Sequence, residues 1–331
     1  MISKPWVLVA SAEAIARLTP LIEAHQKVGP VRAIAVPSGV STPKTVWQDA
    51  AALLWVDAER RSPRTGLPRW YLPGPGGEKI PVGWLPNAPE HLSTYAQAAA
   101  SLWQRPPHPG PLALLGGRDD RTQALLDRLE THLAPPLSHC RWSAERIPRG
   151  DLLYALGLGL GAALYLGHGF PTGWHSYGGL SHAHLREWQG KPLGALFCLT
   201  CHNASRHLSP LSFAETLVLS GRCGAVFAAT GQTAHSLNQQ LALRLGQAMV
   251  DLAATDQPLT LAACLQHPLV VNLPLQRYRI LGDPMVPMAG SAGSAALALA
   301  VDAPAPHDAL PPLDKALWPG GVERRLRASQ V

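Results

Sequence analysis

The sequence predicts an α/β protein built on a mainly parallel β-sheet that is flanked by helices. Two observations predict this class. Short, strongly apolar runs alternate along the chain with segments of helical periodicity, and glycine- and proline-rich connections separate them. Of the 331 residues, 47% are hydrophobic and 15% are charged, so the chain can build a large core. At roughly 100–200 residues per domain, this length corresponds to one large domain or two small ones.

The first third of the chain contains the elements of one α/β layer. In order, we expect a strand at 6–10, a helix at 12–27, strands at 32–37 and 51–57, a loop-rich stretch at 58–86 and a helix from 89 to 104. The strands are short, continuous apolar runs, which are typical of buried parallel strands. Pro89 stands in the first turn of the last helix, where a missing backbone amide is harmless.

The following residues repeat the pattern. We expect strands at 112–115, 161–167, 194–200 and 224–230, and helices at 119–133, 151–158, 212–220 and 236–253. Gly221 directly follows one of these helices and is a favourable C-terminal cap. The sequence therefore predicts two subdomains, an N-terminal one at 1–110 and a second at 111–290, followed by a Pro/Ala-rich tail at 291–331.

Charge and hydropathy argue against nucleic-acid and membrane binding. The net charge is +6, but the basic residues are scattered except at 59–64 and 323–328, whereas nucleic-acid binding needs a concentrated stripe. The most apolar stretch, 152–167, is shorter than the roughly 20 residues that cross a bilayer. The first residues lack the pattern of a secretory signal, so a cytoplasmic location is expected. Five cysteines, an odd number, indicate free thiols.

A histidine and a cysteine stand just past the ends of two consecutive predicted strands. The run AALYLGHG places His168 after the strand at 161–167, and GALFCLTC places Cys201 after the strand at 194–200. The carboxyl ends of parallel strands line the crevice in which ligands bind, so neighbouring strands would bring both side chains to one edge. One such residue alone is more often structural, and the pair together indicates a site.

This pair has the chemistry of nucleophilic catalysis. The thiolate is the reactive form of cysteine, and a nearby imidazole can take its proton and return it during acyl transfer. We therefore expect Cys201 to be the nucleophile and His168 the acid/base. The amides of Gly169 and Cys201 are the expected oxyanion donors, because a glycine lets the backbone approach a substrate carbonyl closely. Thr230, at the end of a later strand, is expected to line the same cleft.

Four segments carry a resemblance to a known family: YLGHGFPTGWHSYGGLSHAHL, ALFCLTCHNAS, SFAETLVLSGRCGAVFAATGQT and YRILGDPMV. In this order and spacing they resemble the catalytic domain of gingipain-type cysteine peptidases, of the clan that includes caspases, legumain, separase and CHAT-domain proteases. The upstream IPVGWLPNAPEHLSTYAQAAASLW looks like the segment that joins the two subdomains of that family. The resemblance covers about residues 1–290 and implies a caspase-like fold and a cysteine endopeptidase.

The resemblance also implies roles for individual residues. His168 and Cys201 match the catalytic pair, Gly169 matches the oxyanion donor, and Trp174 matches an aromatic residue near the substrate cleft. Asp119 stands where the Arg-specific members hold the carboxylate of the S1 pocket, which favours a guanidinium through a charge-assisted pair. An equally supported interpretation makes Asp119 a first-turn acid favoured by the helix dipole.

The chain also departs from the family pattern. The loop before Asp119 is short, and the acidic residue that some relatives supply near the catalytic histidine has no match, which leaves the residue that orients His168 open. The family's secretion signal, propeptide and following immunoglobulin-like domain are absent, so we expect an intracellular, regulatory enzyme. Its expected partners are a protein or peptide substrate and a restraining regulatory protein. No cofactor is expected, although calcium is allowed as a structural ion.

Two other classes of function stay open. The first is a caspase-like pseudopeptidase, a scaffold that binds a partner without cutting it. The second is a metal or haem site, because Cys198-Leu199-Thr200-Cys201-His202 matches the C-x-x-C-H pattern. The strand pattern argues against a shared metal, since a period of two places Cys198 and Cys201 on opposite faces.

Overall fold

The computed structural model describes residues 4–37, 47–57, 67–106, 110–133, 137–207, 209–255 and 258–288. Its main strands are β1 (Trp6–Ala10), β2 (Val31–Ala35), β3 (Ala52–Asp57), β4 (Tyr71–Pro73), β5 (Lys79–Pro86), β6 (Leu112–Gly116), β7 (His139–Ser143), β8 (Ala162–Leu166), β11 (Leu193–Leu199), β12 (Cys223–Ala229) and β13 (Tyr278–Gly282). They form one sheet in the order β2-β1-β3-β5-β13-β12-β11-β8-β6-β7, with β4 paired to β5. A separate hairpin consists of β9 (Gly169–Phe170) and β10 (Gly173–Trp174).

The sheet consists of two parallel halves that run in opposite directions. Along its main path, every pair of neighbours is parallel except β12 and β13, and β13 is in turn parallel to β5. The predicted mainly parallel sheet is therefore confirmed. The subdomains expected at 1–110 and 111–290 share this sheet, because β5 of the first pairs with β13 of the second.

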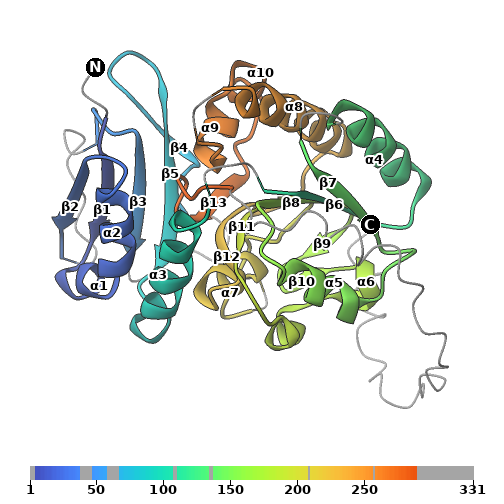
Figure 1. Cartoon of the computed structure of the whole chain (residues 1–331), viewed down its shortest axis with the longest axis horizontal. Helices are drawn as coiled ribbons and strands as arrows, with labels where there is room; N and C mark the ends of the chain where they lie inside the picture. Colours follow the sequence, from blue (N-terminus) through green and yellow to red (C-terminus); the bar gives the residue numbers. More distant parts are fainter. Residues whose placement is uncertain are drawn as a thin grey trace, which may run out of the picture.

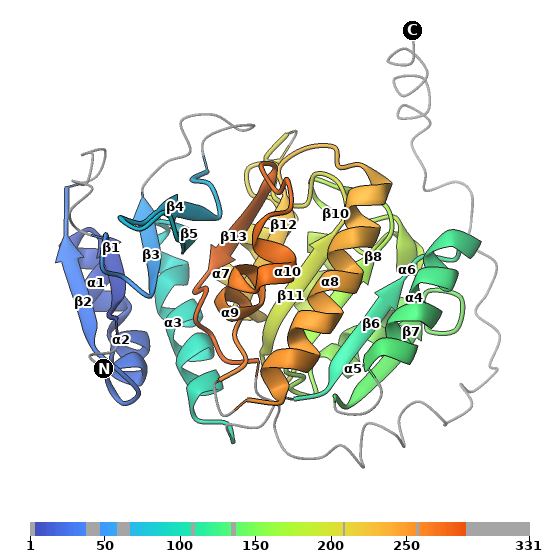
Figure 2. The same cartoon turned by 90° about the horizontal axis from the view of Figure 1, so that it is seen from above.

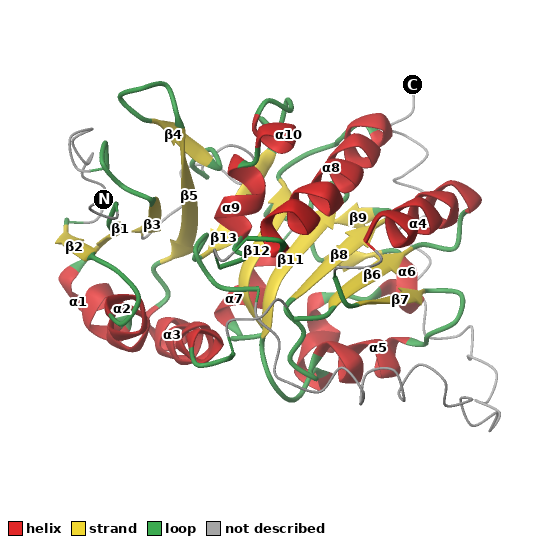
Figure 3. Ribbon diagram, turned by 45° about the horizontal axis from the view of Figure 1, so that its top comes forward, coloured by secondary structure: helices red, strands yellow, loops and turns green. Residues whose placement is uncertain are grey.

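Helices cover both faces of the sheet (Figure 1). The longer helices are α1 (Ala12–Arg17), α2 (Thr19–Gln26), α3 (Pro89–Trp103), α4 (Asp120–Leu133), α5 (Arg149–Leu156), α7 (Phe213–Leu219), α8 (His235–Ala253) and α9 (Leu261–Gln266). Short turns of helix complete the set: α6 (Ser176–Gly179), the 3₁₀ helix η2 (His182–Glu187) and α10 (Pro268–Val271). Helices α1, α2, α3, α5 and α7 lie on one face, and α4, α8, α9 and α10 lie on the other (Figures 1 and 3). Helices α4 and α8 lie side by side across the second half of the sheet (Figure 2).

The central strands are buried on both faces, which explains why their sequences read as continuous apolar runs. Along β11, Leu196 and Cys198 pack into the core beneath α3 and α7, whereas Ala195 and Phe197 pack into the core beneath α4 and α8. The central strands are thus packed between two apolar cores, one on each face, and each strand ends where this burial ends. The ends of these strands in turn position the candidate site.

Two local predictions were wrong. The helix expected at 12–27 is two helices, α1 and α2, which are separated at Leu18. Pro20 has no backbone N–H, so it cannot donate the hydrogen bond that would continue α1. The stretch 58–86, expected to be loop, contains β4 and the central strand β5. Its prolines argue against a strand, but β5 gains partners from β3 and β13, far away in the sequence.

Several predicted features lie outside the described residues: the basic clusters at 59–64 and 323–328 and the tail at 291–331. Within the described ranges, no helix has the length and apolar character needed to cross a membrane.

Candidate active site

Five connections meet at one edge of the second half of the sheet. Because β6, β8, β11 and β12 are parallel neighbours, their carboxyl ends share an edge, and the antiparallel β13 begins at that edge. The residues placed there are Asp119 after β6, His168 after β8, Cys201 after β11, Thr233 after β12 and Arg277 before β13. The structure therefore brings the predicted His168 and Cys201 to the ends of adjacent strands.

The backbone of His168 is held from two sides while its side chain is exposed. The carbonyl of His168 accepts a hydrogen bond from the Tyr165 hydroxyl at 3.1 Å and from the amide of His175 at 3.1 Å. Gly167, which precedes His168, has a φ of 154°, a conformation that L side chains rarely adopt. Among the described residues, no side chain donates or accepts a hydrogen bond at the His168 ring. None of them is therefore assigned as the residue that orients the ring.

Gly169 is the point where the histidine loop touches the cysteine loop. A Cβ atom built on Gly169 would lie 2.6 Å from Oγ1 of Thr200 and 2.7 Å from the carbonyl oxygen of Cys201. These distances are shorter than real Cβ contacts, so only glycine fits there. The Thr200 hydroxyl is buried and has no hydrogen-bond partner among the described residues. The close approach sets the spacing between His168 and Cys201.

The turn after Cys201 is tight. His202 has a φ of 64°, in the left-handed region that non-glycine residues seldom occupy, and its amide donates to the Gly231 carbonyl at 3.2 Å. Farther along, Glu215 is fully buried and accepts hydrogen bonds from Ser212 and from the Arg206 guanidinium. These contacts hold the loop that follows the cysteine.

Asn203 ties the cysteine loop to the β9–β10 hairpin. Its side-chain amide donates to the carbonyls of Phe170 and Gly173 at 2.9 and 2.8 Å, and its Oδ1 accepts from the Trp174 indole at 2.9 Å. Trp174 is 1% exposed and stacks on Tyr165 with ring centroids 3.9 Å apart. A place for Trp174 near the substrate cleft stays a prediction. The ring supports the hairpin that carries His168.

A second set of contacts reaches the sulfur of Cys201. The amide of Thr233 donates to Sγ at 3.4 Å, and the Thr233 hydroxyl lies 3.6 Å from Sγ. That hydroxyl accepts from the side-chain amide of Asn238 at 3.0 Å, and Oδ1 of Asn238 accepts from the Tyr278 hydroxyl at 2.6 Å. Asn238 also donates to the carbonyl of Leu199 in β11. These contacts fix the position of Sγ at the end of β11.

Asp119 begins α4. Its two carboxylate oxygens accept from the amide and the hydroxyl of Thr122 at 3.0 and 2.8 Å, an N-terminal cap. Burial opposes ionisation, but the bonds from Thr122 and the charge of a protonated His168 hold the pKa of this carboxyl below its ordinary value. The bonds to Thr122 therefore show the helix-cap role. Asp119 is also exposed, so its charge faces solvent near His168. Its S1 role stays a prediction.

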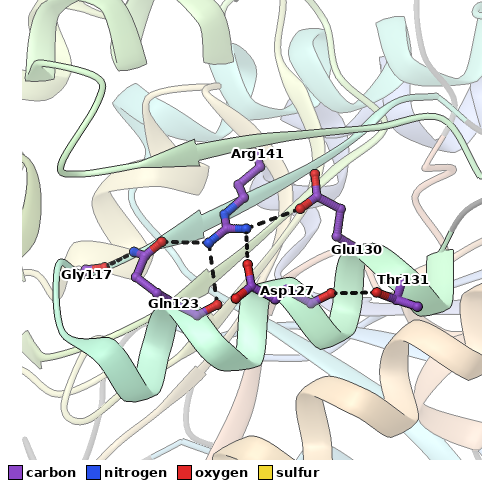
Figure 4. Close-up of polar contacts among 6 residues, drawn as sticks. All are labelled: Gly117, Gln123, Asp127, Glu130, Thr131 and Arg141. Carbon is purple, nitrogen blue, oxygen red and sulfur yellow. Dashed lines mark hydrogen bonds and ion pairs between the residues drawn. The ribbon is translucent and has the colours of Figure 1, made fainter.

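Helix α4 is itself anchored beside the site (Figure 4). The Arg141 guanidinium on β7 pairs with Asp127 and Glu130 on α4 and bonds Gln123 at 2.7 Å. Gln123 in turn donates to the carbonyl of Gly117 at 2.5 Å. These contacts fix the turn between β6 and α4 on which Asp119 stands.

Thr230 joins the end of β12 to the residue before β13. Its amide and its hydroxyl both donate to the carbonyl of Arg277, at 2.9 and 3.1 Å. The hydroxyl is therefore engaged in joining the end of β12 to the start of β13. Contact of Thr230 with substrate stays a prediction.

The other four thiols differ from Cys201 in their surroundings. Burial raises the pKa of Cys198, Cys223 and Cys264, and raises that of Cys140 to about 12. Cys198 is fully buried within β11, where a haem could not be attached. Within the described ranges, no three His, Cys, Asp or Glu side chains group as metal ligands do. In the C-x-x-C-H pattern, Cys198 is thus a buried residue of β11, and Cys201 lies just past the end of that strand.

Sequence reasoning missed Asn203, Thr233 and Arg277 as parts of this edge. The signal that could have identified them was present, because each is a polar residue within a few positions of a strand end. What the sequence lacked was the strand order, which decides which loops become neighbours.

Comparisons with known proteins agree with this geometry. The model of peptidase family C25 matches residues 126–289. The structure of the Arg-specific cysteine proteinase gingipain R aligns with a TM-score of 0.66 and 13% identity, over 87% of this chain and 78% of that chain. Another, described as the structure of a protease, gives 0.65 and 14%, over 87% of this chain and 79% of the other.

A complex of the pro- and mature domains of RgpB from Porphyromonas gingivalis also aligns, with a TM-score of 0.65 and 14% identity, over 86% of this chain and 79% of that chain. At these identities the structural likeness establishes the fold. No curated protein matches the sequence significantly. Residues 126–289 are thus similar to peptidase family C25, and the chain has the fold of the gingipain-type cysteine peptidases, with a cysteine at the carboxyl edge of its sheet.

Proposed function

We propose that this protein hydrolyses peptide bonds through a dyad of Cys201 and His168. The observation that carries the proposal is the contact at Gly169, where the loop after β8 meets the carbonyl of Cys201 so closely that no side chain fits. This contact brings the acid/base and the nucleophile together on two rigid strand ends, a placement suited to catalysis. The caspase-like pseudopeptidase remains the alternative.

The reaction follows from these positions. His168 takes the proton of the Cys201 thiol, and the thiolate attacks the carbonyl carbon of the substrate to form a tetrahedral intermediate. The C–N bond then breaks as His168 gives its proton to the leaving amine, which leaves a thioester. Water, deprotonated by His168, hydrolyses the thioester and restores the free thiol.

The backbone supplies donors for the negative oxygen of the intermediate. In the β9–β10 hairpin, Gly169 is paired with Trp174, and the amide of His175 donates to the carbonyl of His168. In an antiparallel hairpin this pattern makes Gly169 and Trp174 a pair without direct hydrogen bonds, so the Gly169 amide points away from its partner. That amide and the amide of Cys201 are the proposed oxyanion hole.

Cleavage after arginine, or less readily lysine, is the proposed specificity. Asp119 supports it, because its carboxylate is exposed and ionised at the same edge of the sheet. Gingipain R is described as Arg-specific and has the same fold. An intracellular, regulatory role with a restraining protein partner belongs to the same proposal and rests on the sequence.

A panel of fluorogenic peptides with Arg, Lys, Asp or Asn at P1, with and without calcium, tests this function. We expect wild type to release the fluorophore from the Arg peptide, and Cys201→Ala and His168→Ala to be inactive. Cys140→Ser is the matched control, because this partly exposed thiol lies away from the edge and its loss should leave turnover unchanged. Absence of turnover by folded wild type with every peptide would favour the pseudopeptidase, and preference for Asp or Asn would refute the role of Asp119.

A further inference from the structure

A cavity opens beside the nucleophile on the side opposite to Asp119. It has a volume of about 450 Å³ and is lined by residues that include Gln232, Thr233, Leu237, Gln276, Arg277 and Tyr278. Thr233 belongs to both the cavity and the nucleophile's surroundings, since its amide lies 3.4 Å from Sγ of Cys201. A peptide bound at Cys201 therefore passes the mouth of this cavity.

Arg277 is held in place within the cavity wall. Its Nη1 donates to the carbonyl of Gln232 at 2.6 Å, and its own carbonyl receives two hydrogen bonds from Thr230. The guanidinium lies against Gly231, where an added Cβ would be 3.3 Å from Nη1. A guanidinium carries five N–H donors, of which these contacts use one. Arg277 is exposed, so one hydrogen bond restrains its guanidinium and the other donors stay accessible to a ligand.

The charge of Arg277 is not balanced by the cavity. None of the described residues that line it is Asp or Glu, and none of the ion pairs among the described residues includes Arg277. The remaining walls are amides, a hydroxyl and the apolar side chains of Leu237 and Pro274. A carboxylate on a short apolar stem matches this lining, because the guanidinium fork binds carboxylates in bidentate geometry.

We propose that this cavity is a substrate subsite for an acidic side chain, with Arg277 as the residue that binds the carboxylate. The inference rests on the proposed function only in taking the ligand to be a peptide bound at Cys201. Two strand spacings, about 10 Å, separate β11 from β13, and an extended peptide advances about 3.3 Å per residue. The acidic residue therefore lies within about three positions of the scissile bond. With Asp119 on the other side of the dyad, the substrate carries opposite charges on its two sides.

Binding of matched peptides to the Cys201→Ala protein tests the subsite without turnover. The probes are acetylated, amidated peptides with Arg at P1 and with Glu or Gln at each other position from P4 to P3′ in turn. One further pair carries Glu or Gln at P1 in place of Arg. Amidation removes the terminal carboxylate, so only a side chain can supply the charge. Affinities are measured by isothermal titration calorimetry for Cys201→Ala alone and combined with Arg277→Gln or with Arg128→Gln, an exposed arginine on α4.

At one position we expect Glu to bind about tenfold more tightly than Gln, the value of a charge-assisted bond in a partly exposed site. Arg277→Gln should abolish this preference, and Arg128→Gln should retain it. Equal affinities at every position, no binding by any peptide, or a preference that survives Arg277→Gln would overturn the subsite. Cleavage of the same peptides by wild type is measured separately. A preference for Glu without cleavage would support the subsite and refute the peptidase activity. Cleavage without a preference for Glu would support the peptidase activity and refute the subsite.

Discussion

The Trp174 indole donates a hydrogen bond of 2.9 Å to the side-chain oxygen of Asn203, and this buried contact joins the loop that carries the histidine to the loop that carries the cysteine. Asn203 completes the junction by donating to two carbonyls of the β9–β10 hairpin. All the hydrogen-bonding atoms of one buried side chain are thereby used to set the geometry of the candidate dyad.

Asn203→Ala should destabilise the protein and impair the site together. It would leave the buried Trp174 indole without its acceptor and would remove the side-chain donor of the Phe170 and Gly173 carbonyls, at a cost of about 3 kcal/mol in the free energy of unfolding. Urea denaturation and the alkylation rate of Cys201 measure the two effects. Trp174→Phe, which removes one of the three bonds and keeps the stacked ring, should cost about 1 kcal/mol. Wild-type stability in Asn203→Ala would contradict this account of the junction.

Gly169→Ala should remove activity from a folded protein. The added methyl group would meet Thr200 and the Cys201 carbonyl at under 3 Å, so the two loops must separate and the dyad must widen. We expect kcat/KM for the best Arg peptide to fall at least about a hundredfold, since a displacement on the order of 1 Å costs that much. Gly150→Ala is the matched control, because nothing lies within 4 Å of its added Cβ. Equal kcat/KM for both variants would refute the close-contact argument.

Asp283→Asn should test how the N-terminal helices are fastened to the rest of the sheet. Asp283 is fully buried after β13, 2.6 Å from Nε2 of His25 on α2, and it also accepts from the Trp6 indole at 2.9 Å. The amide keeps the shape but puts an NH₂ donor in place of an acceptor oxygen among buried donors, which costs about 3 kcal/mol in the free energy of unfolding measured by chemical denaturation. Glu13→Gln, which breaks an exposed pair with Arg17, should cost under about 0.5 kcal/mol. Similar losses in the two variants would contradict the prediction.

His184 should contribute to a loss of stability in mild acid. Burial and the nearby charge of Arg149 lower the pKa of His184, and its Nδ1 accepts a hydrogen bond from the Ser181 amide, which requires that nitrogen to be unprotonated. The folded state therefore binds this proton less readily than the unfolded state does. The stabilisation is present above the unfolded pKa of about 6.5 and is lost as the pH falls below it.

Urea midpoints at pH 7.5 and pH 5 measure this effect. His184→Asn supplies an oxygen acceptor that does not titrate, so its midpoint should change less between the two pH values than that of wild type. An unchanged pH dependence in the variant would show that His184 does not contribute.

The sequence by itself determined the fold class and the local identity of the central elements. The strands that became β8, β11 and β12 were predicted to within one or two residues, because a strand buried on both faces must be apolar throughout. It also placed His168 and Cys201 at strand ends, since a polar residue after such a run marks where burial stops. The helix cap at Asp119 was equally local, being set by the bonds to Thr122.

Only the tertiary structure decided which of these ends became neighbours. The strand β5 was hidden by its prolines and is stabilised by β3 and β13, whose partnership depends on chain folding. The burial of Trp174, the contact of Thr233 with Cys201 and the cavity at Arg277 each join residues about 30 to 70 positions apart in sequence. Hydrophobic pattern reports how each segment is buried, whereas strand order decides what lies beside it, and the chemistry of this edge depends on the second.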